Sequence, residues 1–275
     1  RYEFQTSTDL NHFTEQPQSF TKDFFPRHGS VISLTEAEMQ RVQEQWGYVA
    51  TCHFESHGNP IIRHIYTADP AAMVENDTLW LFTGHDMEGR QKGYVMRDWQ
   101  LFSTTDMTHW TQHPCPLTVF DFKWATSKQA YAGHVVKRND KYYFYVSTNG
   151  SGIGVAVSNK ITGPYKDAIG KPLLIRQDCF DSKHGWCCID SDIHRIAIST
   201  EHPFEEAPWL HKYQGRYYLT YASGWPEKIA YAIADNVMGP YKTQGVISEI
   251  AGNSNTTHPA IVQYKGQWLF FSHNG

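Results

Sequence analysis

The sequence predicts an all-β fold of the β-propeller type, and two observations carry that prediction. A short aromatic hairpin pattern recurs four times between residues 76 and 273, while helical patterning is almost absent. Hairpins that recur about every 40 to 50 residues, or slightly more, are typical of β-propellers, in which each blade is a small antiparallel sheet.

Each copy of the repeat is a polar turn followed by a strand of alternating aromatic residues. The four copies lie at residues 76–84 (NDTLWLFTG), 139–147 (NDKYYFYVS), 214–222 (QGRYYLTYA) and 265–273 (KGQWLFFSH). Asn-Asp, Gln-Gly or Lys-Gly ahead of Tyr, Phe and Trp are hairpin signals. A later strand with its Gly-Pro turn also repeats, in residues 153–167 and 228–243. We therefore expect a hairpin at all four positions.

The spacing of the repeats indicates an irregular blade in the middle of the chain. Aligning the aromatic strands makes Leu79, Tyr142, Tyr217 and Trp268 equivalent, with separations of 63, 75 and 51 residues. The long interval is either one large blade or two blades of which one is shortened. We favour the second interpretation, because residues 185–193 (GWCCIDSDI) resemble the start of an inner strand that no aromatic strand follows.

Composition and charge exclude several classes of function. The net charge of −4 provides no basic patch for nucleic acid or an anionic membrane. No apolar run approaches the ~18 residues of a transmembrane helix. The five cysteines are odd in number and contain no C-x-x-C pair, so they indicate neither a zinc site nor a disulfide framework.

Polar residues precede the inner strands at nearly constant offsets. Asp69 lies 10 residues before Leu79, Glu206 lies 11 before Tyr217, and His258 lies 10 before Trp268. Inner strands of a propeller run in the same direction, so these side chains are expected to converge at one mouth of the central channel.

Asp190 precedes the irregular unit in the same manner. Taken singly, each of these residues has an ordinary structural explanation: a turn aspartate, a solvated loop acid or a core histidine. Their shared offset favours a functional site, because carboxylates are seldom buried without a partner or a purpose.

Carboxylates around a sugar-sized pocket can hydrolyse a glycosidic bond. One carboxylate stays ionised and takes a proton from water, and the other must be protonated to assist the leaving oxygen. A third carboxylate nearby can raise the pKa of the acid by like-charge repulsion. If water attacks directly, acid and base stand ~6.5–9.5 Å apart and the anomeric configuration inverts.

Four stretches of the sequence resemble glycoside hydrolase family 43, in its β-xylosidase and α-L-arabinofuranosidase members. They are residues 59–86, 185–190 (GWCCID), 205–224 and 252–275, and the likeness covers most of 59–275. The resemblance implies a five-bladed β-propeller that inverts configuration. It also implies action on plant polysaccharides that contain arabinose and xylose.

The resemblance implies a role for each polar residue by its position in the family's motifs. Asp69 in Ala-Asp-Pro would be the general base, and Asp190 in Ile-Asp would orient the acid and tune its pKa. Glu206 would be the general acid, in a Glu-Ala-Pro-Trp motif where the family has Glu-Gly-Pro-Trp. His258 would lie beside a metal or water cluster on the axis, often calcium. Calcium prefers oxygen ligands, so we expect His258 to contact the ion's water shell.

Sugar binding usually requires an aromatic platform, and several side chains flank the catalytic stretches. Trp124, Trp186 and Trp225 are the candidates, and His85 ends the first aromatic strand. Each of the four is equally well explained as a core residue.

The chain departs from the family's pattern in three respects. Only 16 positions separate Asp190 from Glu206, which predicts a shortened third blade, and a strand that closes the family's ring after residue 275 is missing from the sequence. Residues 1–48 do not belong at the front of such a domain. They resemble the tail of a preceding propeller, or else supply a blade-completing strand, with one helical pattern at residues 33–47. The propeller itself is expected to span residues 49–275.

The leading hypothesis is a glycosidase that releases terminal α-L-arabinofuranosyl or β-D-xylosyl residues from arabinoxylan, arabinan or xylo-oligosaccharides. The alternative is a catalytically weak or inactive propeller that only binds glycans, and a protein-interaction propeller is a third hypothesis. A plant cell-wall substrate indicates a secreted or periplasmic protein, with the cytoplasm as the alternative, and the sequence given contains no signal peptide.

Overall fold

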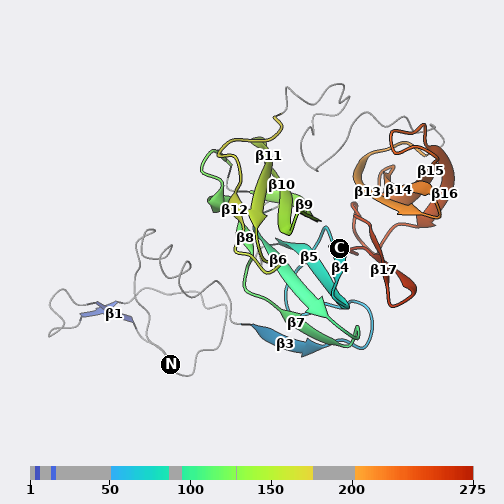
Figure 1. The fold of residues 1–275 in the computed structure, drawn as a ribbon. Helices are drawn as coiled ribbons and strands as arrows, with labels where there is room; N and C mark the ends of the chain where they lie inside the picture. The colour runs from blue at the N-terminus through green and yellow to red at the C-terminus, as the bar shows by residue number, and fades with distance from the viewer. Residues whose placement is uncertain are drawn as a thin grey trace. The chain divides into compact units, whose positions relative to one another are not determined.

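The structure is a computed structural model that describes residues 51–86, 95–127, 129–175 and 202–274, together with the backbone of two short strands near the N-terminus. The chain divides into two compact units, Arg1–Gln45 and Trp46–Gly275 (Figure 1). The first unit contains β1 (Phe4–Thr6) and β2 (Thr14–Gln16), which pair antiparallel. The predicted helix at residues 33–47 lies outside the described residues.

The second unit is built from antiparallel sheets, as the sequence predicts. The first sheet has the order β3-β7-β6-β5-β4, and β8 also pairs with β6. Its strands are β3 (Cys52–Glu55), β4 (Ala71–Glu75), β5 (Thr78–Asp86), β6 (Met96–Thr104), β7 (His109–Gln112) and β8 (Leu117–Thr118), followed by a 3-10 turn at Val119–Asp121.

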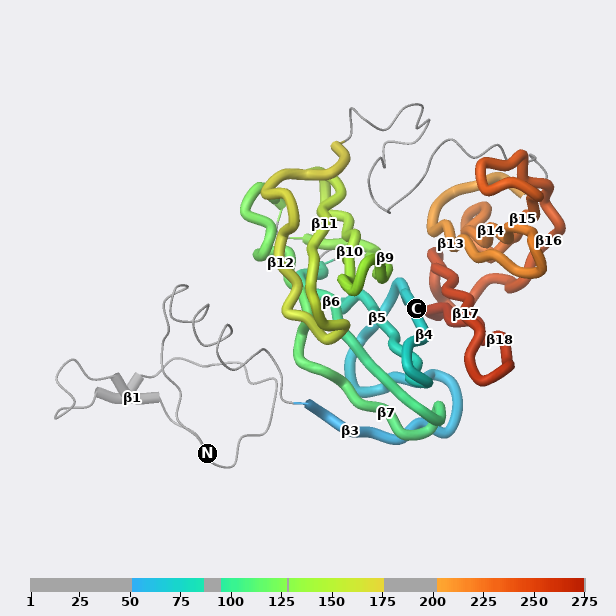
Figure 2. Tube along the Cα trace, in the orientation of Figure 1, coloured from blue at the N-terminus to red at the C-terminus, as the bar shows by residue number. Residues whose placement is uncertain are grey.

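Three further sheets follow in chain order, and each begins with the strand that lies at one of its edges. The second sheet contains β9 (Ala130–Arg138), β10 (Lys141–Thr148), β11 (Gly152–Ser158) and β12 (Lys166–Asp167). The third contains β13 (Glu206–Tyr213), β14 (Arg216–Ser223), β15 (Lys228–Ala234) and β16 (Lys242–Ser248). The fourth is the hairpin of β17 (Ala260–Tyr264) and β18 (Gln267–Phe271), labelled in Figure 2.

The four predicted hairpins are confirmed, and their turns share one backbone form. Each loop has two residues, and both have positive φ, as in a type I′ turn. The loops are Asn76-Asp77, Asn139-Asp140, Gln214-Gly215 and Lys265-Gly266. Asn, Asp and Gly tolerate this left-handed conformation better than other residues, and Asp or Gly stands at the second position of every loop.

Large aromatic side chains form the core and join neighbouring sheets. Trp99 of β6 is 1% exposed, and its indole N–H donates a hydrogen bond of 2.9 Å to the Tyr131 carbonyl of β9. Full burial of one such side chain contributes on the order of 1.5–3 kcal/mol. The leading strands of the sheets also meet, since β4 contacts β9 and β17, and β17 contacts β13. Residues that precede these strands are therefore brought together.

The shortened third blade remains a prediction. The stretch that was expected to form it, with Asp190 and Trp186, lies within residues 176–201, outside the described residues.

Candidate active site

Two carboxylates from different sheets face one histidine. Asp69 lies just before β4, Glu206 is the first residue of β13, and His258 lies just before β17. His258 Nδ1 is 3.4 Å from Asp69 Oδ1, and His258 Nε2 is 3.4 Å from Glu206 Oε1. The side chains are largely buried, with 12%, 21% and 11% of Asp69, Glu206 and His258 exposed. The structure thus brings together three of the four residues that the constant offset selected.

A single imidazole spans the gap between the two carboxylates. Contacts of 3.4 Å on opposite ring nitrogens limit the distance between the contacting oxygens to about 9 Å. This limit is consistent with the separation of about 6.5–9.5 Å that lets a water molecule enter between an acid and a base.

Asp69 is fixed by its backbone and by a second histidine. Its φ is +50°, and its N–H donates a hydrogen bond of 3.2 Å to His273 Nδ1. Because that nitrogen accepts a hydrogen bond, the neutral His273 ring carries its own proton on Nε2. Burial lowers the pKa of His273, which keeps the ring neutral. His273 Nδ1 also lies 3.6 Å from Asp69 Oδ1.

Glu206 is presented by an irregular start to β13. The register with β14 shifts between Glu206 and Trp209, and Ala207 has a φ of +56°. A glycine would adopt this backbone more easily, which gives a physical reason for the Glu-Gly-Pro-Trp form of the motif. Trp209 then anchors the strand, because its indole N–H donates a 2.8 Å hydrogen bond to the Ile261 carbonyl of β17.

A further carboxyl group, Glu227, contacts Glu206 and was not predicted from the sequence. It follows β14 in the turn to β15, is 2% exposed, and shares a side-chain hydrogen bond with Glu206. Burial and the Glu206 charge raise the pKa of Glu227 to about 8. Burial also raises the pKa of Glu206, but hydrogen bonding and charge from His258 outweigh it and leave a net lowering.

The raised pKa therefore belongs to Glu227, the neighbour of the predicted acid Glu206. Two carboxyl groups that share a hydrogen bond titrate as a pair, and such a pair holds one proton over a wide pH range.

Comparisons with known proteins decide the family. Residues 57–187 match the sequence model of Glycosyl hydrolases family 43. A solved α-L-arabinofuranosidase from Clostridium thermocellum is 30% identical, with a TM-score of 0.62 over 77% of this chain and 83% of that one. The chain belongs to glycoside hydrolase family 43.

Other family 43 proteins are similar over most of their length. A β-xylosidase/α-arabinofuranosidase from a compost microbial metagenome, solved with xylotriose in a calcium-free form, is 26% identical. Its TM-score is 0.67 over 81% of this chain and 90% of that one. A xylosidase/arabinosidase from Bacteroides ovatus is 28% identical over 76% of this chain and 86% of its own length.

Family membership confirms the five-bladed β-propeller as the fold class. It also makes the chain a glycosidase of the class that acts on hemicellulose containing xylose or arabinose. No helix among the described residues has the length and apolar character needed to cross a membrane.

The predicted sugar-binding residues have different surroundings. Trp225 is 70% exposed and lies two residues before Glu227, which suits an aromatic platform. His85 lies near the end of β5, and its Nδ1 is 2.8 Å from Oδ1 of Asp98 in β6. Trp124 packs against Phe122, and its indole N–H donates a 2.8 Å hydrogen bond to Asp167, so it supports the second sheet. Their roles in family 43 sugar binding, and that of Trp186, stay predictions.

Asp86 is a second side chain that the sequence did not single out. It ends β5, and its N–H donates a 3.2 Å hydrogen bond to the Tyr66 carbonyl in the segment that leads to Asp69. Its Oδ1 is buried without a hydrogen-bond partner among the described residues. Burial and the Asp69 charge raise the pKa of Asp86.

The described residues do not fit a calcium ion held directly by protein side chains. Both nitrogens of His258 face carboxylates, and the described part of the chain contains no cluster of three or more His, Cys, Asp or Glu suited to a metal. Calcium takes six to eight oxygen ligands, which this arrangement lacks. That His258 contacts the water shell of a calcium ion stays a prediction, and no catalytic step is derived through a metal.

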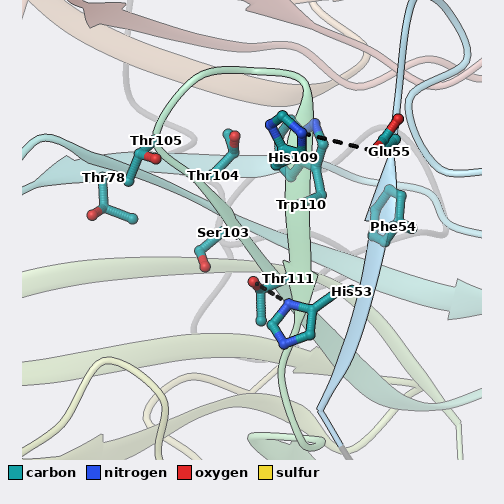
Figure 3. A pocket seen from close by; sticks show the side chains of 10 residues that line it. All are labelled: His53, Phe54, Glu55, Thr78, Ser103, Thr104, Thr105, His109, Trp110 and Thr111. Atoms are coloured by element: carbon teal, nitrogen blue, oxygen red, sulfur yellow. Dashed lines mark hydrogen bonds and ion pairs between the residues drawn. The ribbon is translucent and has the colours of Figure 1, made fainter.

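A cavity of about 480 Å³ on the first sheet is distinct from this site. Figure 3 shows its lining, in which His109 faces Glu55 at 3.8 Å and His53 contacts Thr111 at 3.0 Å. Glu55 is the single carboxylate among its lining residues. Acid and base catalysis of glycoside cleavage requires two carboxyl groups, so this cavity does not have the composition of the catalytic pocket.

Proposed function

We propose that this family 43 protein releases terminal α-L-arabinofuranosyl or β-D-xylosyl residues from arabinoxylan, arabinan or xylo-oligosaccharides, with inversion of configuration. The observation that carries the proposal is the placement of Asp69 and Glu206 on opposite nitrogens of His258. A substrate of this kind is a plant cell-wall glycan, and we propose that the protein meets it in a secreted or periplasmic location.

In this mechanism Asp69 is the general base. Its contacts with His258 and His273 fall on Oδ1, so Oδ2 is the oxygen that takes a proton from the attacking water. Glu206 is the general acid and gives its proton to the departing glycosidic oxygen. Asp190 in the family's Ile-Asp motif is proposed to orient this acid.

Sugar contacts are proposed to come from residues around this pair. Trp225 offers an exposed aromatic face, and His85, Trp124 and Trp186 are the other proposed contacts.

The test compares release of nitrophenol from aryl α-L-arabinofuranoside and aryl β-D-xyloside by the wild type and by Glu206→Ala. We expect turnover by the wild type, a loss of about 10²–10⁴-fold in the variant, and a first-formed sugar of inverted configuration by proton NMR. A retained configuration would overturn the mechanism. A wild type that binds xylo-oligosaccharides without turnover would instead favour the glycan-binding propeller.

A further inference from the structure

Trp225 differs from the other tryptophans in the described part of the chain. Within that part, its ring contacts no other aromatic ring, and its indole N–H donates to no partner. Each of the remaining described tryptophans packs against a neighbouring ring: Trp80, Trp99, Trp110, Trp124, Trp209 and Trp268. Trp225 is also 70% exposed, so it contributes little to the core. An exposed indole with an unused N–H can pack against a ligand and donate a hydrogen bond to it.

The turn that carries Trp225 lies at the catalytic end of the third sheet. It spans residues 224–227 and connects β14 to β15. Glu206, the first residue of β13, pairs with Ala222 near the end of β14. The turn therefore follows directly after the part of β14 that lies beside the proposed general acid.

Glu227 attaches this turn to the segment that leads into β17. The residue is 2% exposed, and its N–H donates a hydrogen bond of 2.9 Å to the Asn255 carbonyl. Its Oε2 accepts a hydrogen bond of 2.8 Å from the N–H of Thr257, which precedes the bridging His258. Because both the backbone and the side chain of Glu227 are bonded to this segment, the turn is fixed relative to the bridging histidine.

We propose that Glu227 is a positioning residue that holds Trp225 as a binding platform for the glycan chain from which the terminal pentose is released. The terminal pentose has to lie between Asp69 and Glu206, whose side chains are only 12% and 21% exposed. Trp225 is too exposed to belong to that enclosed position, so it is placed to contact the part of the substrate that extends beyond it. This inference rests on the proposed function, because it assigns where the remainder of that substrate binds.

The variant Trp225→Ala tests the platform with two kinds of substrate. We expect kcat/KM for an oligosaccharide to fall about three- to tenfold, mainly through KM, because a ring contact with the chain is lost. A pentosyl fluoride has a single atom in place of the chain, and its kcat/KM should change less than about twofold. Equal losses with both substrates would overturn the assignment of Trp225 to the chain.

Trp268→Ala is the matched control for an exposed tryptophan. Trp268 is 41% exposed and lies in β18 next to the hairpin turn, at the end of its sheet away from His258. We expect this variant to keep the wild-type ratio of kcat/KM between the two substrates. A ratio lowered as much as in Trp225→Ala would show that the effect is not specific to the turn, and would overturn the proposal.

Binding measurements test Glu227 separately from any effect on the chemistry of Glu206. Titration calorimetry in an Asp69→Asn background, which stops turnover, gives the Kd of the better bound of xylotetraose and arabinotetraose. Glu227→Met removes the acceptor of the Thr257 N–H at similar volume, and we expect the Kd to rise about three- to tenfold. Glu227→Gln keeps an oxygen acceptor for that N–H and should stay within about twofold. Glu227→Asp shortens the reach by one methylene and should also raise the Kd, which provides a second variant if Glu227→Met does not fold.

A double variant decides whether Glu227 acts through Trp225. We expect Glu227→Met combined with Trp225→Ala to bind no more weakly than Trp225→Ala alone, because both changes remove the same platform. Additive increases in Kd would show that Glu227 acts independently of Trp225 and would overturn its positioning role. A wild type that hydrolyses no glycoside would remove the proposed function, and the calorimetric titration would still decide whether Trp225 binds a glycan chain.

Discussion

Asp69 and Glu206 have the same kind of position in the chain but different neighbours. Each lies at the start of a leading strand, and each contacts His258 at 3.4 Å. Asp69 has a second histidine beside it, His273, whereas Glu206 has a second carboxyl group, Glu227. The proposed acid has a second carboxyl group as its neighbour, whereas the proposed base contacts two histidines. This difference is consistent with the proposed roles of Glu206 as acid and Asp69 as base.

The sharpest test of this comparison is how the kcat/KM of each variant depends on the leaving group of the substrate. We expect Asp69→Asn to lower kcat/KM by about 10²–10⁴-fold for every substrate, because each one needs an activated water. Glu206→Gln should lower it to a similar extent for oligosaccharides but far less for dinitrophenyl pentosides. Steady-state kinetics with both substrate classes measures the contrast, and equal losses in the two variants would contradict the assignment.

The carboxyl pair also predicts how stability depends on pH. Burial and Glu206 raise the pKa of Glu227 from 4.5 to about 8, so between these values the folded protein binds more protons than the unfolded chain. The free energy of unfolding then falls as pH rises, by at most about 1.4 kcal/mol per pH unit from this group.

In Glu227→Gln this fall should disappear, and in Glu205→Gln it should persist. Urea denaturation at about pH 5 and about pH 8 measures the change. Identical slopes in wild type and Glu227→Gln would show that Glu227 has an ordinary titration in the folded state.

Backbone strain beside the acid predicts a smaller effect. Ala207 has a φ of +56°, a conformation that costs a non-glycine residue about 1–2 kcal/mol, partly offset by the greater freedom of glycine in the unfolded chain. Ala207→Gly should therefore raise the free energy of unfolding by about 0.5–1 kcal/mol, measured by urea denaturation. Ala232→Gly, in the interior of β15, is the control and should destabilise the protein.

Removal of divalent metal ions is expected to have the smallest effect. The described residues around His258 form no direct ligand set for calcium, so an ion there would contact the protein through its water shell, and dialysis against a chelator should change kcat/KM by less than about twofold. A larger loss that added calcium restores would show that the axis holds a functional ion.

The parts of the fold that could be predicted are those encoded locally. The hairpins follow from dipeptides such as Asn76-Asp77, because few residues tolerate two left-handed positions in succession. Asp69, Glu206 and His258 could be selected because each lies at nearly the same distance before an aromatic strand.

The rest of the site depends on lateral contacts between sheets that no sequence offset records. Glu227 lies in a turn and His273 follows a final strand, and both reach the site only through packing of neighbouring sheets. The structure also shows a contact of Trp124 that its place in the sequence does not reveal, because its indole N–H donates a hydrogen bond to Asp167 of the second sheet.

The bridging histidine has a consequence for how the catalytic geometry is maintained. Asp69 and Glu206 come from separate sheets, and the width of one imidazole ring sets how closely their carboxylates approach. A ring of fixed size acts as a spacer between the contacting oxygens of the two carboxylates. Their separation on that side is thus determined by a single side chain that belongs to neither strand.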